Sequence, residues 1–348
     1  MAQIDTLLQD MLEMGGSDLH LTVGVPPKAR VSGSLHSMDY EPLSEELLTG
    51  MLSEITPEYR WDHFEESGDA DLAHEIPQVA RFRLNLFRNH WGIGAVFRQI
   101  PAKVDTLDEL GLPDVLKRIS NFQDGLILVT GPTGSGKSTT LAAMLNHINE
   151  KQAKQIITIE DPIEFSHDNQ KSSILHREVG AHCHSFSSGL KGALRADPDV
   201  ILIGELRDRE TMKLALTCAA MGMVVFGTLH TNNATKTIDR LIDAFPAEEQ
   251  NQVRVMLAES LKAIVSQLLC KREGGGRAAV HEILTEHEAL PNAIRQGALS
   301  SIRNIIDQNR DKGMISMDAS LRDLLQKGLI SQNEAYMKAI DKSSFAPA

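Results

Sequence analysis

Residues 131–138 read Gly-Pro-Thr-Gly-Ser-Gly-Lys-Ser and fit the pattern G-x-x-x-x-G-K-[ST] of a phosphate-binding loop. The glycines let successive backbone N–H groups turn inward around an anion without a clash from a Cβ atom. The Lys137 ammonium can reach the β- and γ-phosphates, and the Ser138 hydroxyl can ligate Mg²⁺. The pattern is meaningful only between a strand and a helix. Here the apolar run Leu126–Val129 precedes it, and the helix-forming stretch Thr139–Asn149 follows it.

The N-terminus of that helix would point the positive end of its dipole at the phosphates. The alternative is a glycine-rich turn that binds nothing, and the flanking strand and helix patterns argue against it. The sequence therefore predicts binding of ATP with Mg²⁺. The predicted nucleotide-binding residues are Gly131, Thr133, Gly134, Ser135, Gly136, Lys137, Ser138 and Thr139.

Length and charge limit the remaining classes of protein. A chain of 348 residues predicts about two domains, and a net charge of −12 argues against sequence-independent binding of nucleic acid. The longest uncharged run, Leu214–Leu229, is shorter than the ~20 apolar residues that span a bilayer. Acidic and polar residues throughout the first sixteen positions predict no signal peptide, and three widely spaced cysteines suit a reducing compartment. We expect a cytoplasmic protein without a transmembrane segment.

The first hundred residues predict a small α+β domain, because short helices and alternating strands are mixed there. Helical patterns cover Ile4–Leu12 and Pro42–Ile55, the second with Ser44 as its N-cap. Strand patterns cover residues 19–23, 29–31, 81–86 and 94–100. We expect this domain at 1–100 and a linker at 101–112.

The middle of the chain predicts an α/β core at 113–285, in which apolar strands alternate with helices. The expected strands are Leu126–Val129, Gln155–Ile159, Val200–Ile203, Val224–Gly227 and Ala278–Ile283. A C-terminal helical region is expected at 286–348, with helices near residues 290–295, 300–309, 318–326 and 333–340.

Ligands of open parallel sheets bind beyond the carboxyl ends of the strands, where this sequence repeatedly places polar residues. Glu164 follows the second core strand, Glu205 the third, and His230 the fourth. A carboxylate at Glu205 would act on Mg²⁺ directly or through water, and Glu164 would orient the attacking water. Surface acids without a role are the alternative for both. Three roles for His230 remain open: it could sense the γ-phosphate, bridge subunits or be purely structural.

Two further groups of residues could take part in chemistry. Guanidinium groups suit developing phosphoryl charge, so three arginines of the first domain are candidates, with solvated strand-face arginines as the default interpretation. These are Arg81, Arg83 and Arg98. His176, His182, Cys183 and His184 form a polar cluster, but their spacing is not that of a structural zinc site.

Together these residues resemble the secretion-ATPase superfamily, most closely its PilT-type motors of type IV pili. The resemblance covers nearly the whole chain. It implies a PAS-like N-terminal domain, a RecA-like core and C-terminal helices in a homo-hexameric ring. The implied function is ATP hydrolysis that drives pilus retraction and twitching motility, at an inner-membrane platform protein and beside other pilus ATPases. The motifs are Gly15–His20, Arg81–Asn85, the phosphate loop, Thr158–Glu164, the strand through Gly204–Asp208, and Gly227–Thr231.

The resemblance also implies roles for single residues. Lys137 and Ser138 would hold phosphate and Mg²⁺, Glu164 matches the proposed general base, and Glu205 matches the Walker B acid. In this segment Gly204 replaces the usual strand-end aspartate. The three arginines of the first domain match N-terminal arginines that reach bound nucleotide.

Two segments depart from the PilT pattern. Ala219–Met223 stands where these motors carry Ala-Glu-Thr-Gly-His, and Ala289–Gln296 aligns with Ala-Ile-Arg-Asn-Leu-Ile-Arg-Glu but has Pro291 at the first arginine. Since proline suits only the first turn of a helix, we expect a helix from about Pro291 to about Arg295, which Gly297 can end. The sequence predicts a divergent or auxiliary retraction motor. The alternatives are a pilus extension or secretion ATPase, a RecA-like nucleic-acid translocase, and a nucleotide-gated regulatory subunit with little turnover of its own. Extension-type relatives carry a larger N-terminal region and a four-cysteine zinc motif. This sequence shows neither, which favours a retraction motor.

Overall fold

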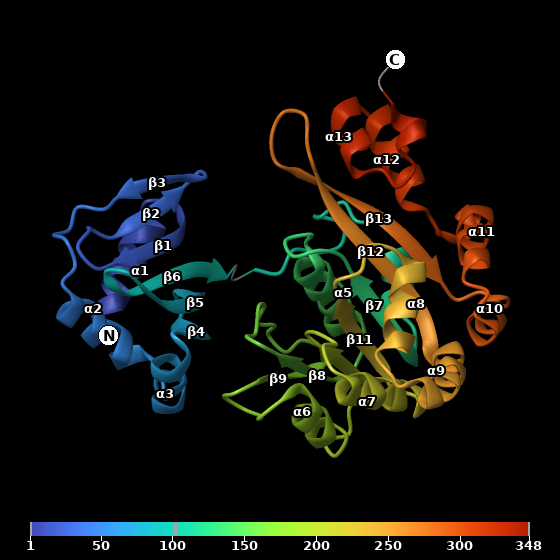
Figure 1. Ribbon diagram of the computed structural model, residues 1–348, viewed down its shortest axis with the longest axis horizontal. Helices are drawn as coiled ribbons and strands as arrows, with labels where there is room; N and C mark the ends of the chain where they lie inside the picture. The colour runs from blue at the N-terminus through green and yellow to red at the C-terminus, as the bar shows by residue number, and fades with distance from the viewer. Residues whose placement is uncertain (1, 101–102, 347–348) are drawn as a thin grey trace. The chain divides into compact units, whose positions relative to one another are not determined.

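The computed structural model describes residues 2–100 and 103–346, which form two units (Figure 1). The first unit is the chain up to Lys103 together with the short segment Asp161–Ser166. The second unit is Val104–Glu160 and the chain from His167 onward. The expected linker at 101–112 includes positions 101 and 102, which lie outside the described residues. The domain boundaries given above stay a prediction.

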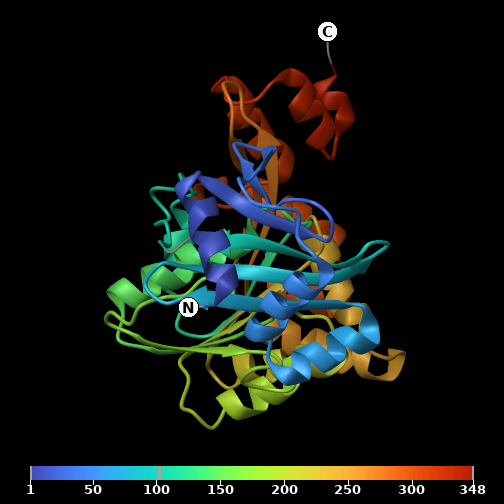
Figure 2. The ribbon, with the colours of Figure 1, turned by 90° about the vertical axis from the view of Figure 1, so that its left-hand side faces the viewer.

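The first unit is a six-stranded antiparallel sheet with three helices. The strand order is β3-β2-β1-β6-β5-β4. Every second side chain of β5, Phe82, Leu84 and Leu86, is fully buried, which confirms the predicted alternation. These side chains share one apolar core with the helices, and Figure 2 shows α1 in dark blue across the strands. The bounds are α1 Gln3–Glu13, β1 Gly16–Thr22, β2 Lys28–Val31, β3 Ser34–Ser37, α2 Glu45–Ile55, α3 Glu58–Ser67, β4 Asp69–Ile76, β5 Ala80–Asn89 and β6 Gly92–Ile100.

Helix ends in this unit follow from local chemistry. The predicted N-cap of α2 is confirmed, because the Ser44 hydroxyl accepts the N–H of Leu47 at 3.2 Å. The predicted start at Pro42 is wrong, since the cap places the first helical residue at Glu45. Helix α3 and strands β3 and β4 were not predicted. Helix α3 buries only Phe64, and every residue of β3 is exposed, so neither carries an apolar period.

The second unit is a seven-stranded sheet in the order β13-β12-β7-β11-β10-β8-β9. All neighbouring strands are parallel except β12 and β13, which pair antiparallel. The bounds are β7 Gly125–Thr130, β8 Gln155–Glu160, β9 Ser173–Glu178, β10 Val200–Ile203, β11 Val224–Leu229, β12 Leu261–Lys271 and β13 Arg277–Thr285. The fold class is therefore α/β, as predicted, with one antiparallel strand at the sheet edge.

Helices bury both faces of this sheet. In β7, Leu126 and Leu128 face one core, whereas Ile127 and Val129 face another. The first core includes side chains of α6 to α11, and the second includes side chains of α4 and α5. A strand that is buried on both faces reads as a continuous apolar run, which explains why the sequence shows β7 so clearly. The helices are α4 Val115–Ser120, α5 Lys137–Lys151, α6 Phe186–Ala193, α7 Arg209–Ala220, α8 Ala234–Asp243 and α9 Ala247–Ser260.

Four helices follow the sheet, as predicted: α10 Leu290–Gln296, α11 Ser300–Gln308, α12 Met317–Gln326 and α13 Gln332–Lys338. Helices α12 and α13 share a small apolar core with Cys270 and Val280 of the β12–β13 hairpin. Helix α10 has Pro291 in its first turn, and Gly297 ends it with φ of 66°. The predicted start and end of this helix are confirmed. None of the helices in the described residues combines the length and the apolar character needed to cross a bilayer.

Candidate nucleotide-binding site

The phosphate loop lies between β7, which ends at Thr130, and α5, which begins at Lys137. Gly131 and Gly136 have φ of 146° and 87°, a region that disfavours other residues. A Cβ atom at Gly131 would lie 2.3 Å from the carbonyl oxygen of Gln267, so only glycine fits there. The loop geometry thus explains the glycines of the motif, and an anion bound in the loop would face the start of α5.

The Lys137 side chain folds back over the loop. Its Nζ atom donates hydrogen bonds to the carbonyl oxygens of Gly131 at 2.9 Å and Pro132 at 3.1 Å. These contacts keep the ammonium group beside the backbone N–H groups of the loop. A phosphate in the loop would therefore meet both the cation and the N–H donors.

The strand ends that the sequence singled out belong to neighbouring strands, since β7, β11, β10 and β8 are consecutive in the sheet. Backbone contacts hold the ends of β10 and β11 together. The Leu206 N–H donates a hydrogen bond to the backbone carbonyl oxygen of Thr228 at 3.0 Å. The Thr228 hydroxyl also donates to the carbonyl oxygen of Gly204. The carboxyl ends of the central strands therefore form one edge, as predicted.

Glu205 lies at this edge between two nitrogen groups. Its Oε1 atom is 3.1 Å from His230 Nε2, and its Oε2 atom accepts a hydrogen bond from Arg207 Nε at 2.8 Å. The carboxylate is 22% exposed and the histidine 46% exposed, so both remain reachable from solvent. The structure thus brings together two predicted site residues and adds Arg207, to which the sequence analysis assigned no role.

The donor set also fits a magnesium ion that accompanies ATP. Mg²⁺ prefers oxygen ligands and is usually held by one or two protein oxygens, with phosphates and water completing its shell. The Ser138 hydroxyl at the first turn of α5 and the Glu205 carboxylate are such donors. The residues present are therefore suited to the ion, and the assignment stays a proposal.

The remaining predicted catalytic residues belong to the first unit, which includes the segment carrying Glu164. Arg83 lies between two carboxylates, with Nη1 3.6 Å from Glu164 Oε1 and Nη2 3.8 Å from Asp71 Oδ2. Arg81 Nη1 lies 3.6 Å from Glu75 Oε2. The first of these contacts places Glu164 beside Arg83, and the role of Glu164 as a base stays a proposal.

Arg98 makes the shortest of these ion pairs, with Nε donating to Asp18 Oδ1 at 2.7 Å. Burial would raise the pKa of Asp18, but the hydrogen bond from Ser17 and the Arg98 guanidinium hold it below its ordinary value. The Arg98 side chain is 70% exposed. Arg98 is therefore anchored by its Nε atom while most of its fork stays open to solvent.

Comparison with known proteins agrees with this site. The family of type II/IV secretion system proteins matches residues 1–273. The chain belongs to this family.

Two relatives and one solved structure are similar over most of their length. A type IV pilus retraction ATPase, PilT, from Pseudomonas aeruginosa is 48% identical over 97% of this chain and 98% of its own. A twitching motility protein from Neisseria gonorrhoeae is 46% identical over 92% of this chain and 86% of its own. The crystal structure of the pilus retraction motor PilT with bound ADP has a TM-score of 0.90 and 40% identity, over 97% of both chains.

Two histidines of the predicted polar cluster, His176 and His182, make hydrogen bonds with neighbouring residues. His176 contacts the Thr158 hydroxyl at 2.9 Å through Nδ1 and accepts the N–H of His167 through Nε2. His182 Nδ1 accepts the N–H of Glu178 at 2.9 Å. Within residues 2–100 and 103–346, no three side chains of His, Cys, Asp or Glu are grouped to hold a metal ion.

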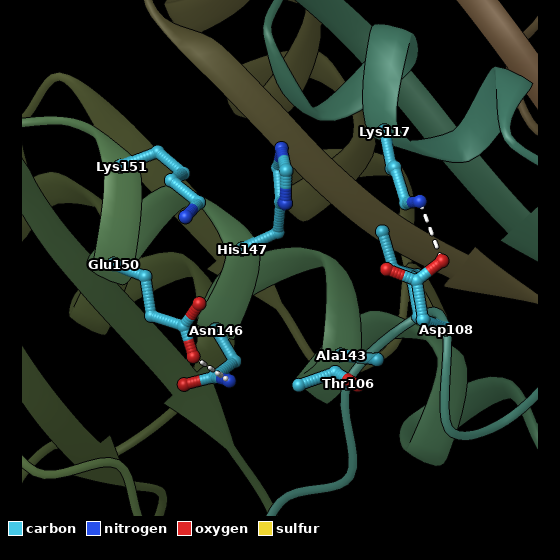
Figure 3. A pocket seen from close by; sticks show the side chains of 9 residues that line it. Thr106, Asp108, Lys117, Ala143, Asn146, His147, Glu150 and Lys151 are labelled. Carbon is cyan, nitrogen blue, oxygen red and sulfur yellow. Dashed lines mark hydrogen bonds and ion pairs between the residues drawn. The ribbon is translucent and has the colours of Figure 1, made fainter.

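A pocket of about 300 Å³ lies along the C-terminal half of α5, between Thr106 and Lys151 (Figure 3). Its charged and polar side chains engage one another, since Lys117 pairs with Asp108 and Asn146 donates to Glu150. None of the predicted site residues lines it. We therefore assign no role in nucleotide binding to this pocket.

One residue that touches the phosphate loop was not predicted from the sequence. Gln267 lies on β12, which was not predicted as a strand, and its amide contacts Ser135 of the loop. The available signal was the pair Ser266-Gln267 inside a run of apolar residues. Two buried polar residues in such a run require partners, but the sequence does not say which.

Proposed function

We propose that this chain is a motor ATPase of type IV pili that couples ATP hydrolysis to pilus retraction. The chain hydrolyses ATP to ADP and phosphate. The observation that carries the proposal is the phosphate loop beside Glu205 and His230, in a chain similar along its length to retraction ATPases. The retraction and twitching functions of those relatives support the same output here.

The chemistry follows from the side chains at the sheet edge. Lys137 leaves its two backbone carbonyls and binds the β- and γ-phosphates, while the loop N–H groups bind the α- and β-phosphate oxygens. The Ser138 hydroxyl and the Glu205 carboxylate would hold the Mg²⁺ that accompanies ATP, and the ion would supply neutralisation of phosphate charge. Glu164 orients the attacking water, and His230 holds the Glu205 carboxylate in place.

Assembly completes the site in this proposal. The chain forms a homo-hexamer, as its resemblance to PilT-type motors implies. In that ring the arginines of the first unit and the phosphate loop of the second unit would come from different subunits. Arg81, Arg83 and Arg98 of one subunit reach the nucleotide of another and stabilise the charge that develops during phosphoryl transfer. The ring works in the cytoplasm at an inner-membrane pilus platform protein, beside other pilus ATPases. The domains are a PAS-like domain at 1–100, a linker at 101–112, a RecA-like core at 113–285 and C-terminal helices at 286–348.

Steady-state ATPase assays with and without DNA test the reaction. We expect hydrolysis that DNA does not stimulate, since the net charge of −12 opposes binding to phosphate backbones. Lys137→Ala should abolish hydrolysis, because the principal phosphate cation is lost. Lys151→Ala, at the other end of the same helix, is the matched control and should leave the rate unchanged. Stimulation by DNA would support a translocase instead.

A second assay tests the biological output. The gene would be expressed in a pilus-bearing strain that lacks its retraction ATPases, and retraction of single pili would be followed by microscopy. We expect the wild-type chain to restore retraction and Lys137→Ala to fail. A chain that fails to restore retraction in this strain, but restores pili to a strain that lacks its extension ATPase, would support an extension ATPase and contradict our proposal.

A further inference from the structure

Gln267 occupies a buried position directly under the phosphate loop. The ladder between β12 and β7 ends at the pair Ser266 and Thr130, so Gln267 is the next residue along β12, where β7 gives way to the loop. Its side chain is almost fully buried, at 2% exposure. A buried primary amide has to satisfy its hydrogen bonds inside the protein, which makes its partners informative.

The amide binds the loop and the helix that follows it. Its Nε2 atom donates to the carbonyl oxygen of Ser135 at 2.7 Å, and its Oε1 atom accepts the Thr140 hydroxyl at 2.7 Å. The orientation of the amide is determined, because a backbone carbonyl can only accept. Gln267 therefore joins the middle of the loop to the first turn of α5, on either side of Lys137.

Packing around the glutamine is equally tight. A Cβ atom at Gly136 would lie 2.7 Å from Gln267 Nε2, and one at Gly131 would lie 2.3 Å from the Gln267 carbonyl oxygen. Two glycines of the phosphate-loop pattern thus make room for this one residue. The loop therefore packs directly against Gln267.

His281 supports the same amide from β13. Its Nε2 atom lies 3.2 Å from Gln267 Oε1, and complete burial lowers the pKa of His281 to about 4. The imidazole is therefore neutral at physiological pH and donates through Nε2 to the amide oxygen. The backbone N–H of His281 donates to the Ser320 hydroxyl of α12 at 3.2 Å. Contacts thus continue from the loop to the C-terminal helices.

We propose that Gln267 is a positioning residue for nucleotide binding: it holds the Ser135 carbonyl and α5 so that the loop N–H groups and Lys137 meet the phosphates. His281 keeps the Gln267 amide in the orientation that this requires. The inference deepens the proposed ATPase function and rests on it only through nucleotide binding by the loop.

The test compares variants of the full-length chain by calorimetric ADP affinity and by kcat and KM for ATP. Gln267→Leu removes the amide and keeps the bulk, and we expect ADP Kd and ATP KM to rise together by about tenfold or more. A variant that is only partly unfolded loses kcat with its folded fraction and keeps both constants. Cys270→Ala, three residues along β12 and facing the other side, is the matched control and should leave both constants unchanged.

A second pair of variants keeps the idea testable if Gln267→Leu does not fold. Thr140→Val removes the hydroxyl whose hydrogen bond Gln267 accepts, whereas Thr140→Ser retains that hydroxyl. We expect ADP affinity to fall for Thr140→Val and to recover in Thr140→Ser. Wild-type ADP affinity in folded Gln267→Leu, or equal affinities in the two Thr140 variants, would overturn the proposal. A wild-type chain that binds ADP but does not retract pili would contradict only the proposed function.

Discussion

His230 Nε2 lies 3.1 Å from Glu205 Oε1, although the two residues follow different strands, β11 and β10. The contact depends on the parallel pairing of those strands, which brings their carboxyl ends to one edge. In the proposed site this pair would lie next to bound nucleotide. The Glu205 carboxylate could then exchange the His230 nitrogen for another partner when the γ-phosphate leaves. We therefore treat the two side chains as one functional unit.

Glu205→Gln should lower kcat by about a hundredfold, because an amide cannot replace the charge of the carboxylate. His230→Ala should also lower kcat, and the double variant should lose less than the sum of the two single losses in activation free energy. His230→Gln keeps a donor and should fall between the wild type and His230→Ala. Steady-state kinetics on the wild type, Glu205→Gln, His230→Ala and the double variant measures this coupling, and strictly additive effects would contradict it.

Glu164→Gln should bind ATP with normal affinity and turn it over about a hundredfold more slowly, since the residue is proposed to orient water without binding phosphate. Binding would be measured by calorimetry and turnover by phosphate release. Glu66→Gln changes an exposed acid of the same unit and serves as the control. If Glu164→Gln kept the wild-type kcat, the assignment of the base would be withdrawn.

Mixing two inactive variants should restore hydrolysis if the arginines act between subunits. Arg83→Ala keeps an intact phosphate loop, whereas Lys137→Ala keeps intact arginines. In a mixed ring, about a quarter of the interfaces would pair an intact loop with an intact arginine. We expect a corresponding fraction of wild-type ATPase activity after co-expression. No recovery in mixed rings that form normally would show that each arginine serves its own subunit.

Pro291→Arg should alter retraction without altering the ATPase rate. Pro291 lies in the first turn of α10, where an arginine would add a cation and an N–H without breaking the helix. Gln296→Arg places the same charge at the exposed C-terminal end of α10 and is the control. Pulling force on single pili and phosphate release would be measured for each chain. Equal force from wild type and Pro291→Arg would mean that the proline has no mechanical consequence.

Acid should destabilise the chain through two buried histidines. Burial lowers the pKa of His167 and of His281 from 6.5 to about 4. Below pH 6.5 the unfolded chain binds protons that the folded chain does not, so stability is complete above 6.5 and is lost as pH falls toward 4. Each histidine should cost about 2 kcal/mol between pH 7 and pH 5.

Urea unfolding at those two pH values measures the loss. His167→Gln and His281→Gln should each reduce the difference between the two pH values. His63→Gln, which changes an exposed histidine, should not reduce it. An unchanged difference in both buried variants would show that these two groups titrate normally.

Local chemistry explains which parts of the fold could be predicted. The phosphate loop, the Ser44 cap and the α10 boundaries each depend on residues within a few positions of one another. Strand β7 is apolar on both faces and was recognised for that reason. Helix α3 buries a single apolar side chain, so no periodicity marked it.

Contacts between distant residues explain what could not be predicted. Gln267 and Ser135 are 132 positions apart, and only the insertion of β12 beside β7 brings them together. Strand β12 mixes leucines with Ser266 and Gln267, a pattern that fits neither an alternating strand nor a buried one. The antiparallel direction of β13 likewise depends on a hairpin whose strand β12 was not recognised.

The hydrogen bonds along the outer side of β13 have a consequence for how these chains tolerate crowding. Ile283 exchanges two backbone hydrogen bonds with Ile315, at 2.8 and 3.2 Å, and the His281 N–H is taken by Ser320. An exposed strand edge with unpaired N–H and C=O groups is a template for aggregation. Ile315 and Ser320 of the C-terminal segment pair with backbone groups of β13. They therefore hinder strand-to-strand association at this edge when many copies are held close together.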